Sequence, residues 1–425
     1  MKHLLFGLSL TGILLCPADV SALDWERAFL KTECPEKIEF KPGEKMEFRF
    51  SLANSDKKIP NGKYFLVWNR LGDDGLKQQG REDLGKEGPL LVTTSLDRPG
   101  FVRITAKILD SKGNTIVRKN KNDKALSFTG GAGVQLERIR SVSPEPADFD
   151  AFWKKQKAKL ARVPVNAQLT LKKTLAGNIN LYAVKIDCAG PRPVTGYMTI
   201  PKNGALKSMP ACVRFDGYGT TVQTPLTKGA QEIYFSINAH GYDLERDSQY
   251  YKDFFKGISR DKYGYAFHPG ENSDPEKAYF NGMALRIMRA LEYVKNRPEW
   301  NGKLYVRGGS QGGLQAIWAG GLDPDVKTFF IEVPWCCNLG DTAESLRMKG
   351  WNPAGTQALL YYDPVNFAKR IQGKFFVTIG AGDHICPPSG ILGMFNQLKC
   401  DKVLTIVQGM DHGWPVGGKR FTFKK

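Results

Sequence analysis

A serine set between glycines is the first residue in this sequence that could do chemistry. Ser310 lies in the run Gly-Gly-Ser-Gln-Gly-Gly, which follows the apolar segment 304–306 and precedes the helix-compatible segment 314–319. A Gly-x-Ser-x-Gly motif between a strand and a helix is typical of a nucleophile elbow, which lifts the hydroxyl clear of a sheet. The same turn would aim the amide of Gln311 at a developing oxyanion. The motif alone is weak, and a phosphate-cradling or purely structural glycine turn is the alternative.

Two later segments supply a base and an acid. A serine hydroxyl is a poor nucleophile until a base takes its proton. The apolar run 375–379 leads into Asp383, and the run 403–407 leads into His412. In α/β hydrolases the acid and the histidine follow the serine in this order. We therefore predict that Ser310, Asp383 and His412 form a catalytic triad, in which the histidine is the base and the aspartate orients it.

Neighbouring residues offer alternatives for these roles. His384 directly follows the predicted acid and is a second candidate for the base. Asp411 is a poorer acid, because it is adjacent to the predicted histidine and adjacent side chains in an extended turn point apart. The second oxyanion donor should follow an early strand. The run 211–215 is followed by Tyr218, whose amide is our candidate, with a simple β-turn as the alternative.

The elements that must position these residues alternate between strand and helix. Apolar runs without a polar alternation are typical of parallel strands buried on both faces. Such runs occur at 211–215, 232–237, 304–306, 328–333, 375–379 and 403–407. Helical patterns are expected at 148–161 and from Asp274 onward. The second half of the chain is therefore predicted to be a doubly wound, mostly parallel α/β sheet of the α/β-hydrolase type.

A different pattern precedes this region. From residue 23 to 128, apolar and polar residues alternate in short runs separated by turn signals, as in the segment that begins at Met46. This predicts a small, immunoglobulin-like β-sandwich, with a structural or glycan-binding role. The glycine-rich segment 129–133 is expected to end the β pattern. The predicted organisation is a signal peptide, a β-domain, a linker and a catalytic domain, at 1–22, 23–130, 131–147 and 148–425.

The first residues are typical of an export signal. A basic start precedes an apolar run at 4–15, which is too short to span a bilayer, and small residues end at Ala22. Lipidation at Cys16 is a weaker interpretation. No later run is long and apolar enough to cross a membrane, so we expect a soluble protein in the periplasm or outside the cell. The net charge of +18 is explained by a basic surface or an acidic glycan partner, and export disfavours nucleic acid.

Cysteines and histidines give no sign of a metal or cofactor. The chain has eight cysteines, too few for a fold held by disulfides, and Cys16 lies in the predicted signal. Adjacent Cys336 and Cys337 are poor partners for each other on grounds of strain. No cysteines and histidines have metal-ligand spacing. We expect an enzyme with no metal and no cofactor.

Several of these segments together resemble one family. The segments 308–313, 362–368 and 383–389 are similar to the nucleophile and acid regions of the acetyl xylan esterase and cephalosporin C deacetylase group, carbohydrate esterase family seven. The resemblance extends from about residue 148 to 412. It implies a secreted esterase that removes short acyl groups, mainly acetyl, from carbohydrates. It also implies that Pro334 and Trp335 line the acyl pocket.

The sequence departs from the family in places that bear on the site. The family has Arg-Gly-Gln after its fourth strand, where this chain has Asn238-Ala239-His240, so we expect His240 to help organise the site wall. His268 lies in a glycine- and aromatic-rich loop and is expected near the site mouth. The leading β-domain is absent from usual members, which leaves the family's ring-like oligomer and xylan itself open.

Two other functions remain as alternatives. A prolyl-oligopeptidase-like peptidase shares the Gly-x-Ser-x-Gly-Gly turn, although its propeller is several times larger than this β-domain. A glycan-binding protein on an inactive hydrolase scaffold is the second, and the intact serine, aspartate and histidine disfavour it.

Overall fold

The computed structural model describes residues 28–54, 62–84, 89–118, 124–340, 347–413 and 418–425. The predicted signal peptide, 1–22, lies outside the described residues. Within these ranges, no helix has both the length and the apolar character needed to cross a membrane.

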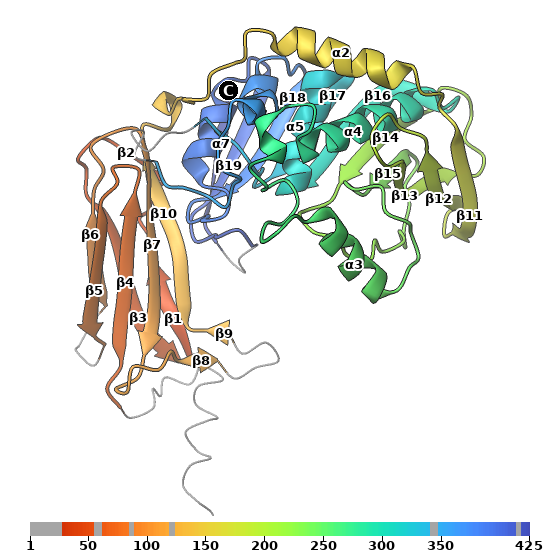
Figure 1. Cartoon of the computed structure of the whole chain (residues 1–425). Helices are drawn as coiled ribbons and strands as arrows, with labels where there is room; N and C mark the ends of the chain where they lie inside the picture. Colours follow the sequence, from red (N-terminus) through yellow and green to blue (C-terminus); the bar gives the residue numbers. More distant parts are fainter. Residues whose placement is uncertain (1–27, 55–61, 85–88, 119–123, 341–346, 414–417) are drawn as a thin grey trace, which may run out of the picture.

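The N-terminal region folds as two β-sheets packed face to face (Figure 1). One sheet has the strand order β1-β3-β6 and the other β2-β10-β7-β4-β5, with a separate β8-β9 hairpin. Phe48 and Phe50 on β3 pack into the same buried cluster as Ile104 on β7, as the predicted alternation requires. The strands are β1 (Ala28–Glu33), β2 (Glu39–Phe40), β3 (Met46–Asn54), β4 (Phe65–Gly72), β5 (Lys77–Asp83), β6 (Leu90–Thr94), β7 (Gly100–Leu109), β8 (Val117–Arg118), β9 (Lys124–Ala125) and β10 (Ser127–Val134).

The glycine-rich segment 129–133 does not end the β pattern as expected. It forms the second half of β10, which pairs with β7 along its whole length. The glycines are required by close approach: a Cβ on Gly131 would lie 2.5 Å from the carbonyl oxygen of Ala381 in the second half of the chain. Composition alone suggested a linker, whereas the structure uses the missing side chains to bring two backbones together.

The second half of the chain is one ten-stranded sheet with a parallel centre. The strands β15, β14, β16, β17, β18 and β19 run parallel, and antiparallel strands flank them on both sides. This confirms the predicted fold class, and the expected strands lie within the observed ones to within a few residues. The strands are β11 (Ala167–Leu175), β12 (Ile179–Ile186), β13 (Val194–Pro201), β14 (Met209–Phe215), β15 (Ile233–Ile237), β16 (Trp300–Gly309), β17 (Val326–Glu332), β18 (Lys374–Gly380), β19 (Asp401–Val407) and β20 (Arg420–Lys424).

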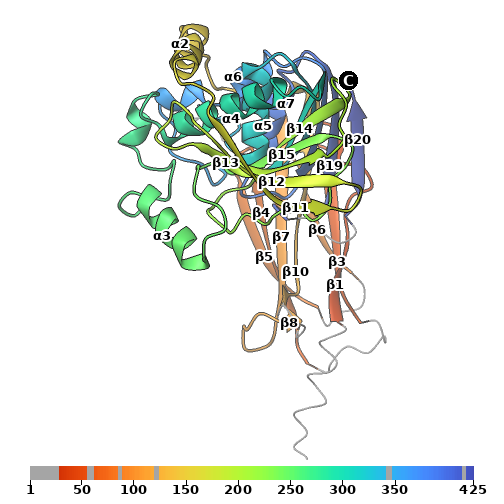
Figure 2. The same cartoon turned by 90° about the vertical axis from the view of Figure 1, so that its right-hand side faces the viewer.

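Helices α4, α5, α6 and α7 form a layer against this sheet (Figure 2). The helix expected from Asp274 begins at Tyr279 instead, because the amides of Lys277 and Ala278 bond to the Asp274 carbonyl in a preceding turn. The helices are α2 (Phe149–Ala161), α3 (Ser248–Ile258), α4 (Tyr279–Lys295), α5 (Gln311–Leu322), α6 (Pro364–Ala368) and α7 (Pro388–Phe395), with 3-10 turns η1 (Leu136–Arg138), η2 (Glu271–Ser273) and η4 (Ala358–Tyr361).

Candidate active site

Ser310 lies in a strained turn between β16 and α5. Its φ is 55° and its ψ is −121°, a conformation that costs energy for any residue with a side chain. A Cβ on Gly308 would lie 2.3 Å from the Gly312 carbonyl oxygen, and one on Gly312 would lie 2.2 Å from the Phe215 carbonyl oxygen. The flanking glycines are therefore needed to wind the turn, and the predicted elbow is present.

The structure brings the three predicted residues together in a line. His412 Nε2 lies 3.0 Å from Ser310 Oγ, and His412 Nδ1 lies 3.0 Å from Asp383 Oδ2. The Asp383 side chain is fully buried, and its Oδ1 accepts the backbone amides of Ile385 and Cys386. Because those two bonds occupy Oδ1, only Oδ2 is left to accept Nδ1–H. The imidazole is then held with Nε2 free to accept a proton from the serine.

The alternative base lies in a separate pair. His384 Nδ1 is 2.7 Å from Asp411 Oδ1, and the His384 side chain is about half exposed. Asp411 thus bonds the alternative histidine instead of His412. Among the described contacts, neither residue of this pair touches the Ser310 hydroxyl.

Two backbone amides are available as oxyanion donors. The amides of Gln311 and Tyr218, both predicted for this role, have no acceptor among the described residues. Tyr265, which sequence reasoning missed, holds the two loops together. Its ring stacks on Tyr218 at a centroid distance of 4.1 Å, its hydroxyl donates to Gln311 Oε1 at 2.6 Å, and that hydroxyl accepts the Gly219 amide at 2.9 Å. Burial raises the pKa of Tyr265 well above its ordinary value, so the hydroxyl keeps its proton.

His240 is buried and faces the back of the oxyanion loop. Its Nε2 lies 3.2 Å from the Gly219 carbonyl oxygen and its Nδ1 2.8 Å from the Tyr279 hydroxyl. Burial lowers the pKa of His240 to about 3, helped by the charge of Arg286. The ring is therefore neutral at ordinary pH. Its position fits the expected role in organising the wall of the site.

An aromatic wall stands beside the serine. The Trp335 amide donates to the Ser310 carbonyl at 3.0 Å, and its indole ring stacks near Trp351 with centroids 5.4 Å apart. Phe267 contacts both tryptophan rings. The Trp335 backbone thus lies next to the serine, and the lining of an acyl pocket by Pro334 and Trp335 stays a prediction. Trp351 was missed, because no motif singled it out.

His268, the last pocket candidate, forms hydrogen bonds within its own loop. Its Nε2 lies 3.3 Å from Asp261 and its Nδ1 accepts the amide of Gly270. The neighbouring Phe267 makes the aromatic contacts instead. The expected place of His268 near the site mouth stays a prediction.

Cys386 is a further residue at the site that the sequence did not reveal. Its sulfur lies close enough to Asp383 and His412 for the three side chains to hold a metal ion, since their ligand atoms are all within 4.8 Å of one another. Burial raises the pKa of the Cys386 thiol well above its ordinary value. A cysteine binds a metal ion as its thiolate, so the burial that keeps Cys386 protonated disfavours a metal here.

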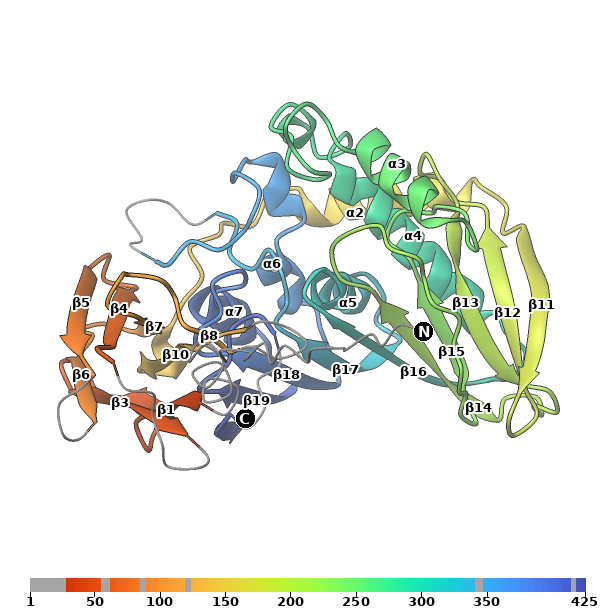
Figure 3. The same ribbon diagram turned by 90° about the horizontal axis from the view of Figure 1, so that it is seen from below.

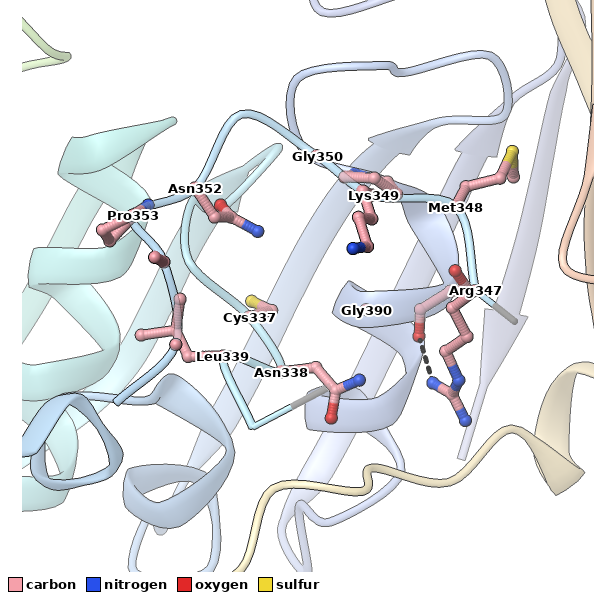
Figure 4. Close-up of a pocket in the computed structure, with 14 residues that line it drawn as sticks. Cys337, Asn338, Leu339, Arg347, Met348, Lys349, Gly350, Asn352, Pro353 and Gly390 are labelled. Atoms are coloured by element: carbon pink, nitrogen blue, oxygen red, sulfur yellow. Dashed lines mark hydrogen bonds between the residues drawn. The ribbon is translucent and has the colours of Figure 1, made fainter. Parts of the chain in front are cut away.

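A cavity of about 200 Å³ lies between segments that follow Trp335 and flank Trp351 in sequence (Figure 4). The segment 347–353 forms one side of it, and the segment 337–339 forms the opposite side. Arg347 donates a hydrogen bond to the Ser389 carbonyl, and both residues line the cavity. No residue of the triad lines this cavity.

Comparisons with known proteins identify relatives of this chain. The acetyl xylan esterase (AXE1) family matches residues 133–346 and 353–420. Acetyl esterase Axe7A of Xylanibacter ruminicola is 24% identical over 443 residues, which cover 99% of this chain and 95% of that protein. Solved acetyl xylan esterases from Paenibacillus sp. R4 and Thermoanaerobacterium sp. JW/SL YS485 share its fold. The first has a TM-score of 0.55 and 24% identity, and the match covers 66% of this chain and 94% of that structure. The second has a TM-score of 0.54 and 20% identity, and the match covers 67% of this chain and 94% of that structure.

The family match covers more than half of the chain and includes every residue of the predicted triad. The whole-length relative is an acetyl esterase. The chain therefore belongs to the acetyl xylan esterase (AXE1) family and is a carboxylic ester hydrolase.

Proposed function

We propose that this protein is an exported serine esterase that removes short acyl groups, mainly acetyl, from carbohydrates such as acetylated xylan or xylo-oligosaccharides. One observation carries the mechanism: two hydrogen bonds of 3.0 Å join the Ser310 hydroxyl, the His412 imidazole and the Asp383 carboxylate. Membership of the AXE1 family supports the acetyl group and the carbohydrate.

The reaction proceeds in two acyl-transfer steps. Ser310 Oγ attacks the ester carbonyl while His412 Nε2 takes its proton, and the buried Asp383 carboxylate stabilises the imidazolium. The amides of Gln311 and Tyr218 bind the oxyanion. The imidazolium then protonates the leaving sugar oxygen, and a water molecule activated by the same imidazole releases the acid. None of these steps requires a metal or a cofactor.

The aromatic wall supports the proposed preference for small acyl groups. Trp335 is fully buried beside Ser310 and is held by a bond from its indole nitrogen to the Trp351 carbonyl oxygen. We expect a rigid wall at this position to leave little room for a longer acyl chain. We expect acetyl esters to exceed butyryl esters in kcat/KM by about tenfold or more, because each methylene that fits poorly costs about 1–3 kcal/mol.

The test is a serine substitution with a matched control. Ser310→Ala should abolish hydrolysis of 4-nitrophenyl acetate and of acetylated xylan while leaving the circular dichroism spectrum unchanged. Ser208→Ala, on an exposed turn, should retain full activity. Substantial activity of folded Ser310→Ala would remove this serine as the nucleophile. Faster cleavage of a prolyl amide than of the acetyl ester would instead favour a peptidase.

Export and the domain boundaries belong to the same proposal. We expect a signal peptide at 1–22 and a mature chain that begins at Leu23. N-terminal sequencing of the protein from a cell-envelope or medium fraction tests this. The β-domain and the catalytic domain are expected to meet between β10 and α2.

A further inference from the structure

The β-domain touches the two loops that carry the acid and the base. The Gly131 amide of β10 donates to the Gln408 carbonyl at 3.2 Å, four residues before His412. A Cβ on Gly382 would lie 2.7 Å from the Gly130 nitrogen, so the backbone before Asp383 rests directly on β10. These contacts join backbone to backbone, with no side chain between them to absorb a shift. Figure 3 shows β10 beside β18 and β19, whose ends carry these loops.

A buried carboxylate of the β-domain makes a second contact. Asp73 follows β4 and is 2% exposed. Its Oδ2 accepts the Phe101 amide within the β-domain, and its Oδ1 accepts the Met348 amide at 2.8 Å and lies 3.3 Å from the Ser389 hydroxyl. One side chain thus fixes two segments of the catalytic half, one on each side of Asp383 in sequence.

These two segments lead directly to the site. Three residues after Met348, the Trp351 amide donates to the Ile385 carbonyl at 2.9 Å, and Ile385 is the second residue after Asp383. Ser389 lies in the first turn of α7, six residues after the acid. The Asp73 carboxylate therefore supports both the aromatic wall and the loop that carries the acid.

The packing between the two halves differs from that of a tethered accessory module. Interfaces between independently moving domains are more polar than a domain core. Here Phe101 and Val102 of β7 belong to the same buried apolar cluster as Ile391 and Leu392 of α7. A carboxylate buried in such a place is tolerated because backbone amides and a hydroxyl satisfy it, and removing it leaves those donors unpaired.

We propose that the β-domain is part of the catalytic apparatus and that Asp73 is a positioning residue for the loop of Asp383 and the wall of Trp351. This inference rests on the proposed function. It assigns the β-domain a role in chemistry at Ser310 that does not depend on binding a polymer. A displacement of about 1 Å at a catalytic group lowers turnover by about 100-fold, so small losses of support become visible in kcat.

The experiment compares three variants of the full chain. Asp73→Ala removes the carboxylate, and Asp73→Asn keeps its shape and one acceptor oxygen. Gly131→Ala places a Cβ against two carbonyl oxygens, that of Val102 within the β-domain and that of Ala381 in the catalytic half. On 4-nitrophenyl acetate, a substrate with no sugar, we expect kcat to fall by about 10- to 100-fold with KM changed less than about threefold. Asp73→Asn should retain more activity than Asp73→Ala, because its oxygen can still accept the Met348 amide.

Matched controls separate this effect from general damage. Asp97→Ala changes an exposed aspartate of the same domain, and Gly257→Ala adds a Cβ where nothing lies within 4 Å. Both should keep kcat within about twofold of the parent. A folded Asp73→Ala and a folded Gly131→Ala with parental kcat would overturn the inference. A defect on acetylated xylan alone would also overturn it, because that result indicates glycan binding. Failure of all three variants to fold would overturn it as well, because that result indicates a purely structural contact. Activity of Ser310→Ala bears on the proposed function only.

Discussion

The substitution Asp383→Asn tests the hydrogen-bond order at the site most directly. Oδ1 of Asp383 accepts two backbone amides, from Ile385 at 2.9 Å and Cys386 at 2.8 Å. An asparagine must therefore keep its oxygen there and turn its NH₂ group toward His412 Nδ1. Nδ1 then becomes an acceptor, the ring proton moves to Nε2, and Nε2 can no longer accept from Ser310.

The expected loss follows from this tautomer change. An aspartate that orients and stabilises the histidine contributes about 10⁴-fold to kcat, which corresponds to about 5 kcal/mol of transition-state stabilisation. Both backbone bonds survive in Asp383→Asn, so the free energy of unfolding should change little. Stopped assays of 4-nitrophenyl acetate hydrolysis, with urea unfolding on the same preparations, separate the two quantities.

The neighbouring pair provides the control for this prediction. Asp411→Asn weakens the contact between Asp411 and His384, which lies outside the line of the triad, and should lower kcat less than about threefold. If Asp383→Asn kept a tenth or more of parental kcat while Asp411→Asn lost most of it, the order Ser310–His412–Asp383 would be refuted and His384 would be the better base.

The surroundings of the triad give three further predictions. Tyr265→Phe leaves the Gly219 amide and Gln311 Oε1 without their hydrogen-bond partner. We expect the free energy of unfolding to fall by about 1–3 kcal/mol and kcat to fall by about tenfold. An unchanged kcat would show that Tyr265 does not position the oxyanion loop. His240 is held neutral with a pKa of about 3, below its unfolded value, so its contribution to stability is complete above about pH 6.5 and is lost as pH falls. Between pH 7.5 and pH 5, the free energy of unfolding measured in urea should fall by about 2 kcal/mol more in the parent than in His240→Gln. Equal decreases would contradict the burial of His240 as a neutral ring. EDTA should leave acetyl esterase activity unchanged, because the protonated Cys386 thiol disfavours a metal at the triad; reversible inactivation by the chelator would revive the metal interpretation.

Local sequence patterns were sufficient for the six parallel strands of the catalytic half, but did not indicate the antiparallel strands β11, β12, β13 and β20. Runs such as 375–379 are apolar at nearly every position, and such runs occur where strands are buried on both faces. The position of each candidate then followed from strand ends, because the carboxyl ends of parallel strands meet at one edge. For Ser310, the glycines before and after it were visible as a motif.

The remaining features depend on contacts between distant segments. The glycine-rich half of β10 has the composition of a linker, but it is a strand because it pairs with β7, and its glycines allow Val102 and Ala381 to approach closely. Trp351 has no local pattern, since its role comes from stacking on Trp335. The loop of His268 was singled out because it is rich in aromatic residues, but only the structure shows that Phe267 makes its ring contact with Trp335. Such differences are set by tertiary packing, which local propensity does not encode.

The left-handed backbone at Ser310 has a practical consequence for trapping complexes. Alanine at this position would still carry a Cβ at a φ of 55°, so Ser310→Ala removes the nucleophile and keeps the strain. Glycine would relieve a cost of about 1 kcal/mol or more. We therefore expect Ser310→Gly to melt at a higher temperature than the parent. That would make it the better inactive protein for crystals with an intact acetylated sugar.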